Sequence, residues 1–166
     1  ACNVVIALDG FPLALDQAGA YIEETGCSFG DYLQLYEHHR ATLLARRGKQ
    51  ATNYPDSVAT TWLLSFEKIE QAHPAAVELL QLCTFLSPDH IPEELLTDGA
   101  AHWPSVLQKA VADQFSFNEL LETLLAFSLI RRLTQGRLLS LHRLVQAVQM
   151  DKMDLLVQRT WAERVI

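Results

Sequence analysis

The stretch from Leu129 to Gln149 limits the possible folds of this chain more than any other part of the sequence. Two short runs rich in aliphatic residues flank Gln135-Gly136. Because glycine tolerates a positive φ, this pattern predicts a β-hairpin with a tight two-residue connection. After His142 the period changes, and apolar residues follow at helical spacing: Leu144, Val145 and Val148. We therefore expect a strand to end at a histidine that opens a helix, and we look for function at this junction.

The residues before the hairpin predict a series of helices with recognisable ends. Pro12 occupies the place of a first helical residue, and the apolar stripe that follows it ends near Gly26. Ser28 with Asp31 resembles a capping box, which marks the start of the next helix. Helices followed by a two-stranded hairpin are the order of a winged helix. The predicted fold is therefore mainly α, a small helical bundle followed by a winged helix-turn-helix domain with a two-stranded β-hairpin.

The length and the distribution of polar residues predict two small domains. A chain of 166 residues, 49% of them hydrophobic, can build one ordinary core or two smaller ones. The segment from Arg46 to Pro55 is polar, poor in aliphatic residues and contains both Gly and Pro, which is typical of a linker. We expect a helical subdomain at residues 1–50 that begins within a helix, a linker at 51–56, and a winged-helix domain at 57–166.

Charge is unevenly distributed along the chain and argues against nucleic-acid binding. The net charge of −7 divides into −3 for residues 1–60, −8 for 61–128 and +4 for 129–166. The acidic middle would be repelled by phosphate backbones, whereas the basic end could meet phosphate or an acidic partner surface.

The last helix before the hairpin would be the recognition helix of a DNA-binding winged helix. Ser116 with Glu119 predicts a capping box at its start. This helix offers three polar side chains to base edges and no basic one: Asn118, Glu119 and Glu122. The following basic residues are expected on a solvated face: Arg131, Arg132, Arg137 and Arg143. Nucleic acid is not an expected partner, although a winged-helix transcription regulator stays open as the alternative function.

The sequence lacks the motifs of an enzyme, a metal site or a membrane protein. Gly48-Lys49 is followed by Gln50, and Leu43 stands where a phosphate-binding loop has its first glycine. No catalytic residues are expected, and the three cysteines have no second Cys or His at metal-ligand spacing. No apolar run approaches the roughly 20 residues of a membrane span, and the beginning lacks a signal-peptide pattern. We expect a soluble, cytoplasmic protein that is not an enzyme.

Three motifs, in order along most of the chain, resemble one protein family. The residues Leu8-Asp9-Gly10-Phe11-Pro12-Leu13-Ala14-Leu15 resemble the Gly-Leu-Pro-Leu-Ala-Leu motif of NB-ARC proteins, a branch of the signal-transducing (STAND) nucleotide switches. Residues 17–22 and 62–69 look like the microbial members that carry tetratricopeptide repeats. The stretch from Ser140 to Gln146 is similar to the Met-His-Asp stretch of the family's winged-helix domain.

The resemblance implies a switch that senses ADP or ATP and relays its state to a C-terminal sensor domain. In that family a P-loop domain binds the nucleotide, and the helical and winged-helix domains close over it. The resemblance implies that Pro12 packs on the adenine and that His142 hydrogen-bonds the β-phosphate of ADP. It also implies partners in the same chain, a P-loop domain and sensor repeats, and self-association on activation. No nucleotide is expected on residues 1–166 alone, and the complete protein would be a slow ATPase.

The chain departs from the family pattern at two of the matched positions. Arg143 stands where the family often has Asp, which reverses the local charge and makes Arg143 a candidate contact for phosphate or a partner. Phe11 replaces the usual Leu, a bulkier neighbour that alters packing beside Pro12.

Overall fold

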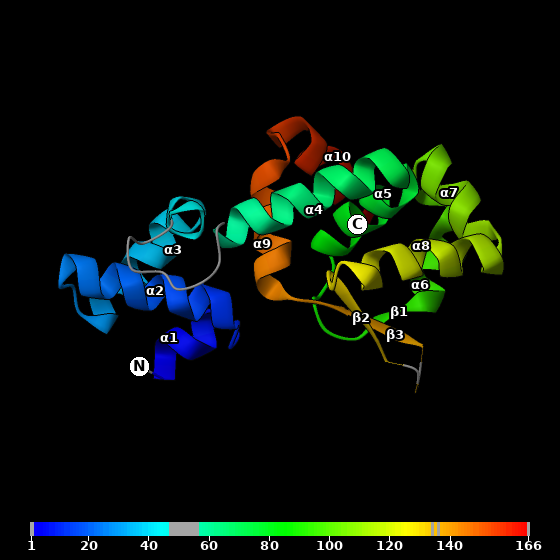
Figure 1. Ribbon diagram of the computed structural model, residues 1–166. Coiled ribbons are helices and arrows are strands. Elements are labelled where there is room, and N and C mark those ends of the chain that lie inside the picture. The colour runs from blue at the N-terminus through cyan, green and yellow to red at the C-terminus, as the bar shows by residue number, and fades with distance from the viewer. Residues whose placement is uncertain (1, 47–56, 134, 136, 166) are drawn as a thin grey trace. The chain divides into compact units, whose positions relative to one another are not determined.

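The computed structural model describes residues 2–46, 57–133, 135 and 137–165, and these form a mainly α fold with a small antiparallel sheet (Figure 1). In chain order the elements are α1 (Cys2–Ala7), α2 (Pro12–Thr25), α3 (Phe29–Ala45), α4 (Val58–Ala72), α5 (Pro74–Thr84), β1 (Ile91–Pro92), α6 (Glu93–Asp98), the 3-10 helix η1 (Gly99–His102), α7 (Ser105–Ala112), α8 (Gln114–Ala126), β2 (Ile130–Leu133), β3 (Leu138–Leu141), α9 (Arg143–Lys152) and α10 (Leu155–Val165). The predicted mainly α fold class is confirmed. None of the described helices is long and apolar enough to cross a membrane.

The chain divides into two compact units, residues 1–64 and 65–166, with the division falling inside α4. The first unit contains α1, α2, α3 and the first half of α4. The second contains the rest of α4, the later helices and the sheet. The linker expected at residues 51–56 lies outside the described residues.

The predicted helix ends in the first unit are confirmed. Pro12 is the first residue of α2, and Gly26 ends it in the left-handed conformation with φ of 66°. At the start of α3, the Ser28 hydroxyl accepts a hydrogen bond from the Asp31 N–H at 3.1 Å. The Asp31 carboxylate accepts from the Ser28 N–H at 3.1 Å in return. Both halves of the capping box are therefore present.

A buried amide, that of Gln17 in α2, connects the end of α3 to the start of α4. Its side chain is only 5% exposed. The Nε2 atom donates to the Arg46 carbonyl at 3.2 Å, and Oε1 accepts from the Val58 N–H at 3.2 Å. Arg46 and Val58 stand on either side of residues 47–56, so this one side chain fixes both flanks of that segment.

The core of the second unit is formed by the leucine-rich faces of α5, α7, α8 and α9. Fully buried side chains on α5, α7 and α8 include Leu79, Leu82, Leu107, Phe117, Leu120, Leu121 and Leu124, and α4 adds Phe66. Helix α5 packs against α7, α8 and α9, which makes it the central helix of this unit. Burial of these faces is the main source of the unit's stability.

The sheet contains the predicted hairpin and one further strand. Its order is β1-β3-β2, and both pairs are antiparallel. Leu133 pairs with Leu138, so four residues connect the strands. The expected two-residue connection at Gln135-Gly136 is therefore wrong by two residues. Strand β1 was not anticipated because two residues ending in proline carry no strand signal of their own.

The start of α8 differs from the prediction. Asp113, not Ser116, is the N-cap: its carboxylate accepts from the Ser116 N–H at 2.8 Å. The helix therefore begins three residues earlier than the expected Ser116–Glu119 capping box. Asp113 is preferred because its side chain reaches the third N–H of the helix, and the helix dipole favours a carboxylate there. Hydrogen bonds from the Ser116 N–H and from the Ser116 hydroxyl hold the pKa of Asp113 below its usual value.

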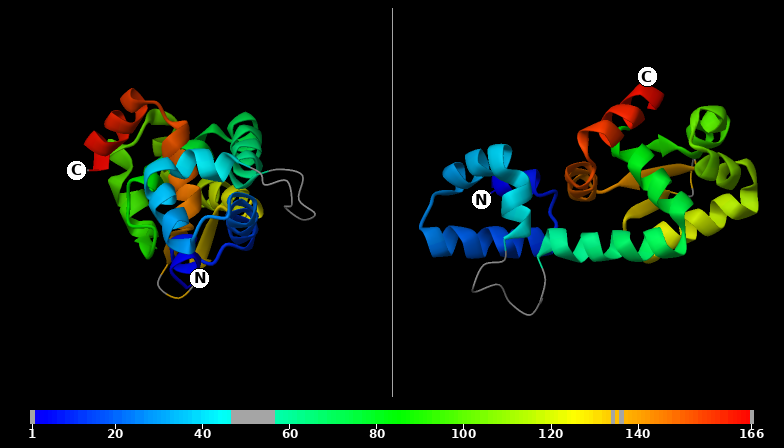
Figure 2. Two further views of the ribbon diagram at one scale, coloured as in Figure 1. Left: turned by 90° about the vertical axis from the view of Figure 1, so that its left-hand side faces the viewer. Right: turned by 90° about the horizontal axis from the view of Figure 1, so that it is seen from above.

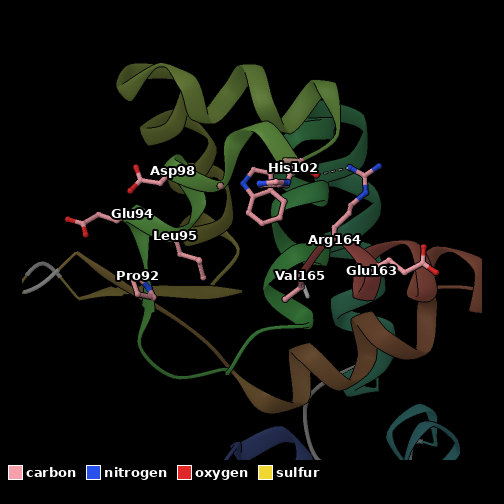
Figure 3. Close-up of a pocket in the computed structure, with 10 residues that line it drawn as sticks. Pro92, Glu94, Leu95, Asp98, His102, Glu163, Arg164 and Val165 are labelled. Carbon is pink, nitrogen blue, oxygen red and sulfur yellow. Dashed lines mark hydrogen bonds between the residues drawn. The ribbon is translucent and has the colours of Figure 1, made fainter.

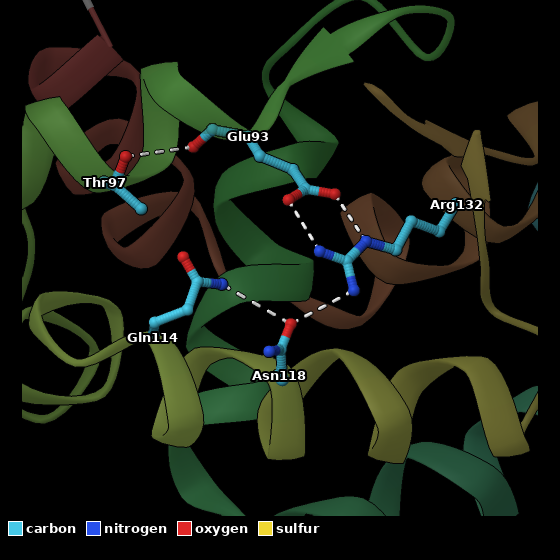
Figure 4. A network of polar contacts seen from close by, with 5 residues as sticks. All are labelled: Glu93, Thr97, Gln114, Asn118 and Arg132. Atoms are coloured by element: carbon cyan, nitrogen blue, oxygen red, sulfur yellow. Dashed lines mark hydrogen bonds and ion pairs between the residues drawn. The ribbon is translucent and has the colours of Figure 1, made fainter. Parts of the chain in front are cut away.

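An ion pair anchors the hairpin to α6 and α8 (Figure 4). Arg132 Nε and Nη2 donate to the two carboxylate oxygens of Glu93 at 2.6 and 2.8 Å, and its Nη1 donates to Asn118 Oδ1 at 3.1 Å. The Glu93 N–H also donates to the Arg137 carbonyl at 2.9 Å. Glu93 is 4% exposed, and its hydrogen bonds raise the pKa of Arg132. The expected solvated position of Arg132 is therefore wrong.

We expect Gln17→Met to lower the free energy of unfolding by roughly 1–3 kcal/mol, the usual effect of leaving buried backbone groups unpaired. Methionine keeps the length of the side chain but cannot bond Arg46 or Val58. The same substitution at exposed Gln34 in α3 is the control and should change stability little. Chemical denaturation of both variants measures the difference. An equal effect at the two positions would contradict the proposed role of the buried amide.

We expect Arg132→Met to destabilise the second unit by about 2 kcal/mol, because the buried Glu93 carboxylate loses its counter-charge. The effect should stay below that of a fully buried pair, since 30% of the Arg132 side chain is exposed. Arg131→Met, on the exposed face of the same strand, is the matched control. Adding Glu93→Leu to Arg132→Met should recover part of the lost stability in thermal unfolding. Additive losses would show that the two side chains are not coupled.

Candidate functional site

The junction between β3 and α9 is the predicted site, and the structure confirms how it is built. Strand β3 ends at Leu141 and α9 begins at Arg143. His142 lies between them with φ of −63° and ψ of 131°, an extended conformation that turns the chain from strand to helix. The chain passes directly from the strand into the helix (Figure 2). A histidine therefore ends the strand and caps the helix.

The imidazole of His142 is oriented by the helix that it caps. Its Nδ1 accepts a hydrogen bond from the Leu144 N–H at 3.2 Å. A ring nitrogen that accepts an N–H carries no proton, so the neutral ring has its proton on Nε2. The half-buried ring is thus set as a hydrogen-bond donor at Nε2, beside the positive end of the α9 dipole.

The loop that follows α5 holds this junction in place. The Leu141 N–H donates to the Pro88 carbonyl at 2.8 Å. One turn into α9, Gln146 Nε2 donates to the carbonyls of Thr84 at 2.8 Å and Leu86 at 3.0 Å. These bonds satisfy carbonyls at the C-terminal end of α5 and fix the first turn of α9 against it.

Arg143 lies at the first position of α9 and points into solvent. Its side chain is 68% exposed and lies 3.5 Å from an Asp89 carboxylate oxygen. An exposed pair at this distance contributes little to stability and is screened by salt. The guanidinium therefore has the freedom to meet an anion or a partner surface. Asp89 supplies a local acid 54 residues upstream, which partly offsets the charge reversal at this position.

Pro12 belongs to the first unit, whereas His142 and Arg143 belong to the second. Pro12 is exposed at the start of α2. The preceding Phe11 packs its ring against that of Trp62, with centroids 5.0 Å apart. The bulkier residue at position 11 therefore fills space beside α4, and the proline ring stays at the surface.

Sequence reasoning missed the residues that position the junction. Gln146 lies at the end of the Ser140–Gln146 stretch. A polar residue among the apolar positions of a helix is the one signal that could have indicated its role. Pro88 and Asp89 carry no signal, because their contacts join segments more than 50 residues apart.

The described residues contain no group of three or more His, Cys, Asp and Glu side chains that could hold a metal ion. The cysteines are free: Cys83 is buried, Cys27 is half-buried and Cys2 is exposed. Burial raises the pKa of the Cys83 thiol to about 12, which removes its reactivity at neutral pH.

Comparison with known proteins gives one family and one relative. The family described as "Domain of unknown function (DUF7779)" matches residues 67–156. The chain is also similar to a protein of Hyaloscypha variabilis (strain UAMH 11265 / GT02V1 / F) named "Nucleotide-binding leucine-rich repeat (NLR)-like protein". The two are 26% identical over 153 residues, which cover 87% of this chain and 14% of that protein. No solved structure matches the chain. Because the matched residues include the central helices, the hairpin and all of α9, the chain belongs to the DUF7779 family.

Proposed function

We propose that this chain is the regulatory part of a nucleotide-dependent molecular switch of the NB-ARC type. In this proposal His142 binds the β-phosphate of ADP through Nε2, and Pro12 packs on the adenine. The observation that carries it is the hydrogen bond from the Leu144 N–H to Nδ1, which assigns the proton of the neutral ring to Nε2. The name of the fungal relative supports the same class, because it describes a nucleotide-binding protein.

The chemistry of the junction suits a diphosphate. An N–H donor beside a helix N-terminus favours an anion, since the donor and the dipole act on the same charge. A proline ring offers a rigid apolar surface to a base without loss of side-chain entropy. Arg143 adds a cation that can reach a phosphate or an acidic partner surface.

The other parts of the switch are proposed to lie elsewhere in the same protein. The chain spans only 14% of the length of its fungal relative. A P-loop domain would supply the phosphate-binding loop and the metal, and C-terminal repeats would sense the signal. Nucleotide exchange between ADP and ATP would open the assembly and permit self-association in the cytoplasm. Residues 1–166 alone should not retain nucleotide, because a few peripheral contacts do not offset the entropy of binding.

The second unit is proposed to be a winged helix that packs on protein and not on DNA. Strand β1 follows α5, precedes α6, α7 and α8, and pairs with β3 of the hairpin, an order that fits a winged helix. DNA reading would need donors on α8 and on the hairpin. However, Arg132 and Asn118 bond each other, and Arg132 is also paired with Glu93. Their engagement within the protein favours the switch over the transcription regulator.

Helix α9 also contains a side chain that destabilises its present packing. Gln149 is 0% exposed. Neither its Nε2 nor its Oε1 has a hydrogen-bond partner among the described residues. A buried unpaired amide is unfavourable by roughly 1–3 kcal/mol. Such a packing suits an element that changes position in a switch, because a second arrangement can pair the amide.

Two variants of His142 separate its capping role from the proposed ligand role. Asparagine caps helices well but lacks the imidazole Nε2, whereas alanine removes both functions. His142→Ala should lower the free energy of unfolding by about 1 kcal/mol, and His142→Asn should leave it nearly unchanged. In the complete protein, both should weaken ADP binding roughly tenfold or more, the effect of losing a hydrogen bond to a charged group, and raise basal activity.

The control for this test is Asp113→Ala, which removes the N-cap of α8 in the same unit. It should destabilise the protein without changing ADP affinity. ADP affinity is measured by isothermal titration and activity by the output of the complete protein. Wild-type ADP binding in His142→Asn would contradict the ligand role and leave capping alone.

Pro12→Ala should lower the affinity of the complete protein for adenine nucleotides several-fold, because the base loses a rigid apolar surface. Pro74 is the matched control, since it is also an exposed proline at the first position of a helix. Pro74→Ala should alter stability to a similar small extent and leave nucleotide affinity unchanged. Equal nucleotide affinity in both variants would remove Pro12 from the proposed site.

A further inference from the structure

A groove on the second unit lies between α6 and the end of α10 (Figure 3). It has a volume of about 750 Å³. Its apolar lining comes from four residues: Pro92, Leu95, Trp103 and Val165. Leu95 and Val165 face the hollow, and Leu95 is 44% exposed. A large aliphatic side chain exposed inside a concave surface is typical of an interaction site.

The wall of the groove is rigid. The Trp103 indole N–H donates to the Leu96 carbonyl at 2.8 Å. A Cβ atom at Gly99 would lie 2.5 Å from Trp103 Cζ2, so the ring is packed directly on the backbone of η1. A partner would therefore meet a preformed surface, and it would not need to order this side chain on binding.

The rim of the groove is acidic. Glu94 and Asp98 are four residues apart on α6, and Figure 3 shows both carboxylates turned outward on the same side. Within the described chain, neither forms an ion pair with a basic side chain. Glu163, on α10, pairs with Arg159 at 2.8 Å. Asp98 ends α6, where the negative end of the helix dipole makes an unpaired carboxylate unfavourable.

Arg164, the one arginine or lysine among the residues that line the groove, is engaged within the protein. Arg164 Nη1 donates to the His102 carbonyl at 3.2 Å, and its guanidinium lies over the Trp161 ring at 5.7 Å. The groove therefore presents an apolar centre and a rim with unpaired negative charge. An apolar centre with a polar rim is the anatomy of a protein-binding surface, and the negative rim disfavours nucleic acid.

We propose that this groove binds a basic amphipathic segment of another protein. One or two apolar side chains of the segment fill the space between Leu95 and Val165. Lysine or arginine residues that flank them pair with Glu94 and Asp98 on the rim. This interaction is separate from the nucleotide chemistry of His142 and does not depend on it.

The test uses two fluorescein-labelled helical peptides and fluorescence anisotropy. The first has two leucines one turn apart flanked by lysines, and the second has glutamates in place of the lysines. The chain should bind the lysine peptide at least tenfold more tightly than the glutamate peptide. Glu94→Lys with Asp98→Lys should lower the affinity for the lysine peptide at least tenfold, and Leu95→Ser should lower this affinity about fivefold or more. Glu122→Lys, an exposed charge reversal on α8, should change it less than twofold.

Circular dichroism checks that each variant is folded, which is expected because all the substituted side chains are exposed. Equal binding of the two peptides would overturn the proposal, as would equal weakening by Glu122→Lys and by the rim variants. Sedimentation velocity of the chain alone tests whether a second copy of the chain occupies the groove instead. A dimer that Glu94→Lys with Asp98→Lys dissociates would assign the groove to a second copy and would also overturn the proposal.

Discussion

The hydrogen bond from the Leu144 N–H to His142 Nδ1 decides what the junction between β3 and α9 can do. It gives an acceptor to a backbone N–H that has none within the helix, and it also selects the tautomer of the ring. A serine or aspartate at this position would cap the helix equally well but would carry no ring N–H donor. The capping bond and the proposed phosphate contact therefore use the two nitrogens of one side chain. Structural and functional roles coincide at this residue.

This arrangement depends on how firmly the surrounding unit holds the junction. The loop after α5 holds Leu141 through the Pro88 carbonyl, and Gln146 connects the first turn of α9 to the end of α5. The hairpin is in turn anchored by the pairing of Arg132 with Glu93. The unpaired amide of Gln149 lies further along the same helix. The N-terminal turn is thus well determined, whereas the middle of α9 contains a group that its present packing leaves unsatisfied. A switch needs this combination of a fixed contact residue and a packing that can change.

The fold could be predicted where the signal is local. The proline that starts α2, the glycine that ends it and the capping box at Ser28 each follow from the properties of one or two residues. The hairpin and the helix after His142 were also predictable, because the spacing of apolar residues changes at His142. The start of α8 was predicted incorrectly, since both Asp113 and Ser116 are good caps and local sequence does not rank them.

The features that could not be predicted are long-range. Strand β1 is two residues long and exists because β3 is already there to pair with it. Arg132 has the sequence context of an ordinary solvent-exposed hairpin arginine. Its partner Glu93 is 39 residues away in the chain, yet Glu93 Oε1 lies 2.6 Å from Arg132 Nε. The candidate site shows the same limit: His142 and its capping role follow from the motif, but the loop that holds it does not.

The central claim is that the imidazole Nε2 of His142 contacts a diphosphate. An experimental structure of the complete protein bound to ADP measures this most directly. The account predicts that Nε2 lies about 3 Å from a β-phosphate oxygen, the usual length of an N–H···O hydrogen bond, while Nδ1 still accepts from the Leu144 N–H. A ring that keeps its capping bond but lies beyond hydrogen-bonding distance of the phosphates would contradict it.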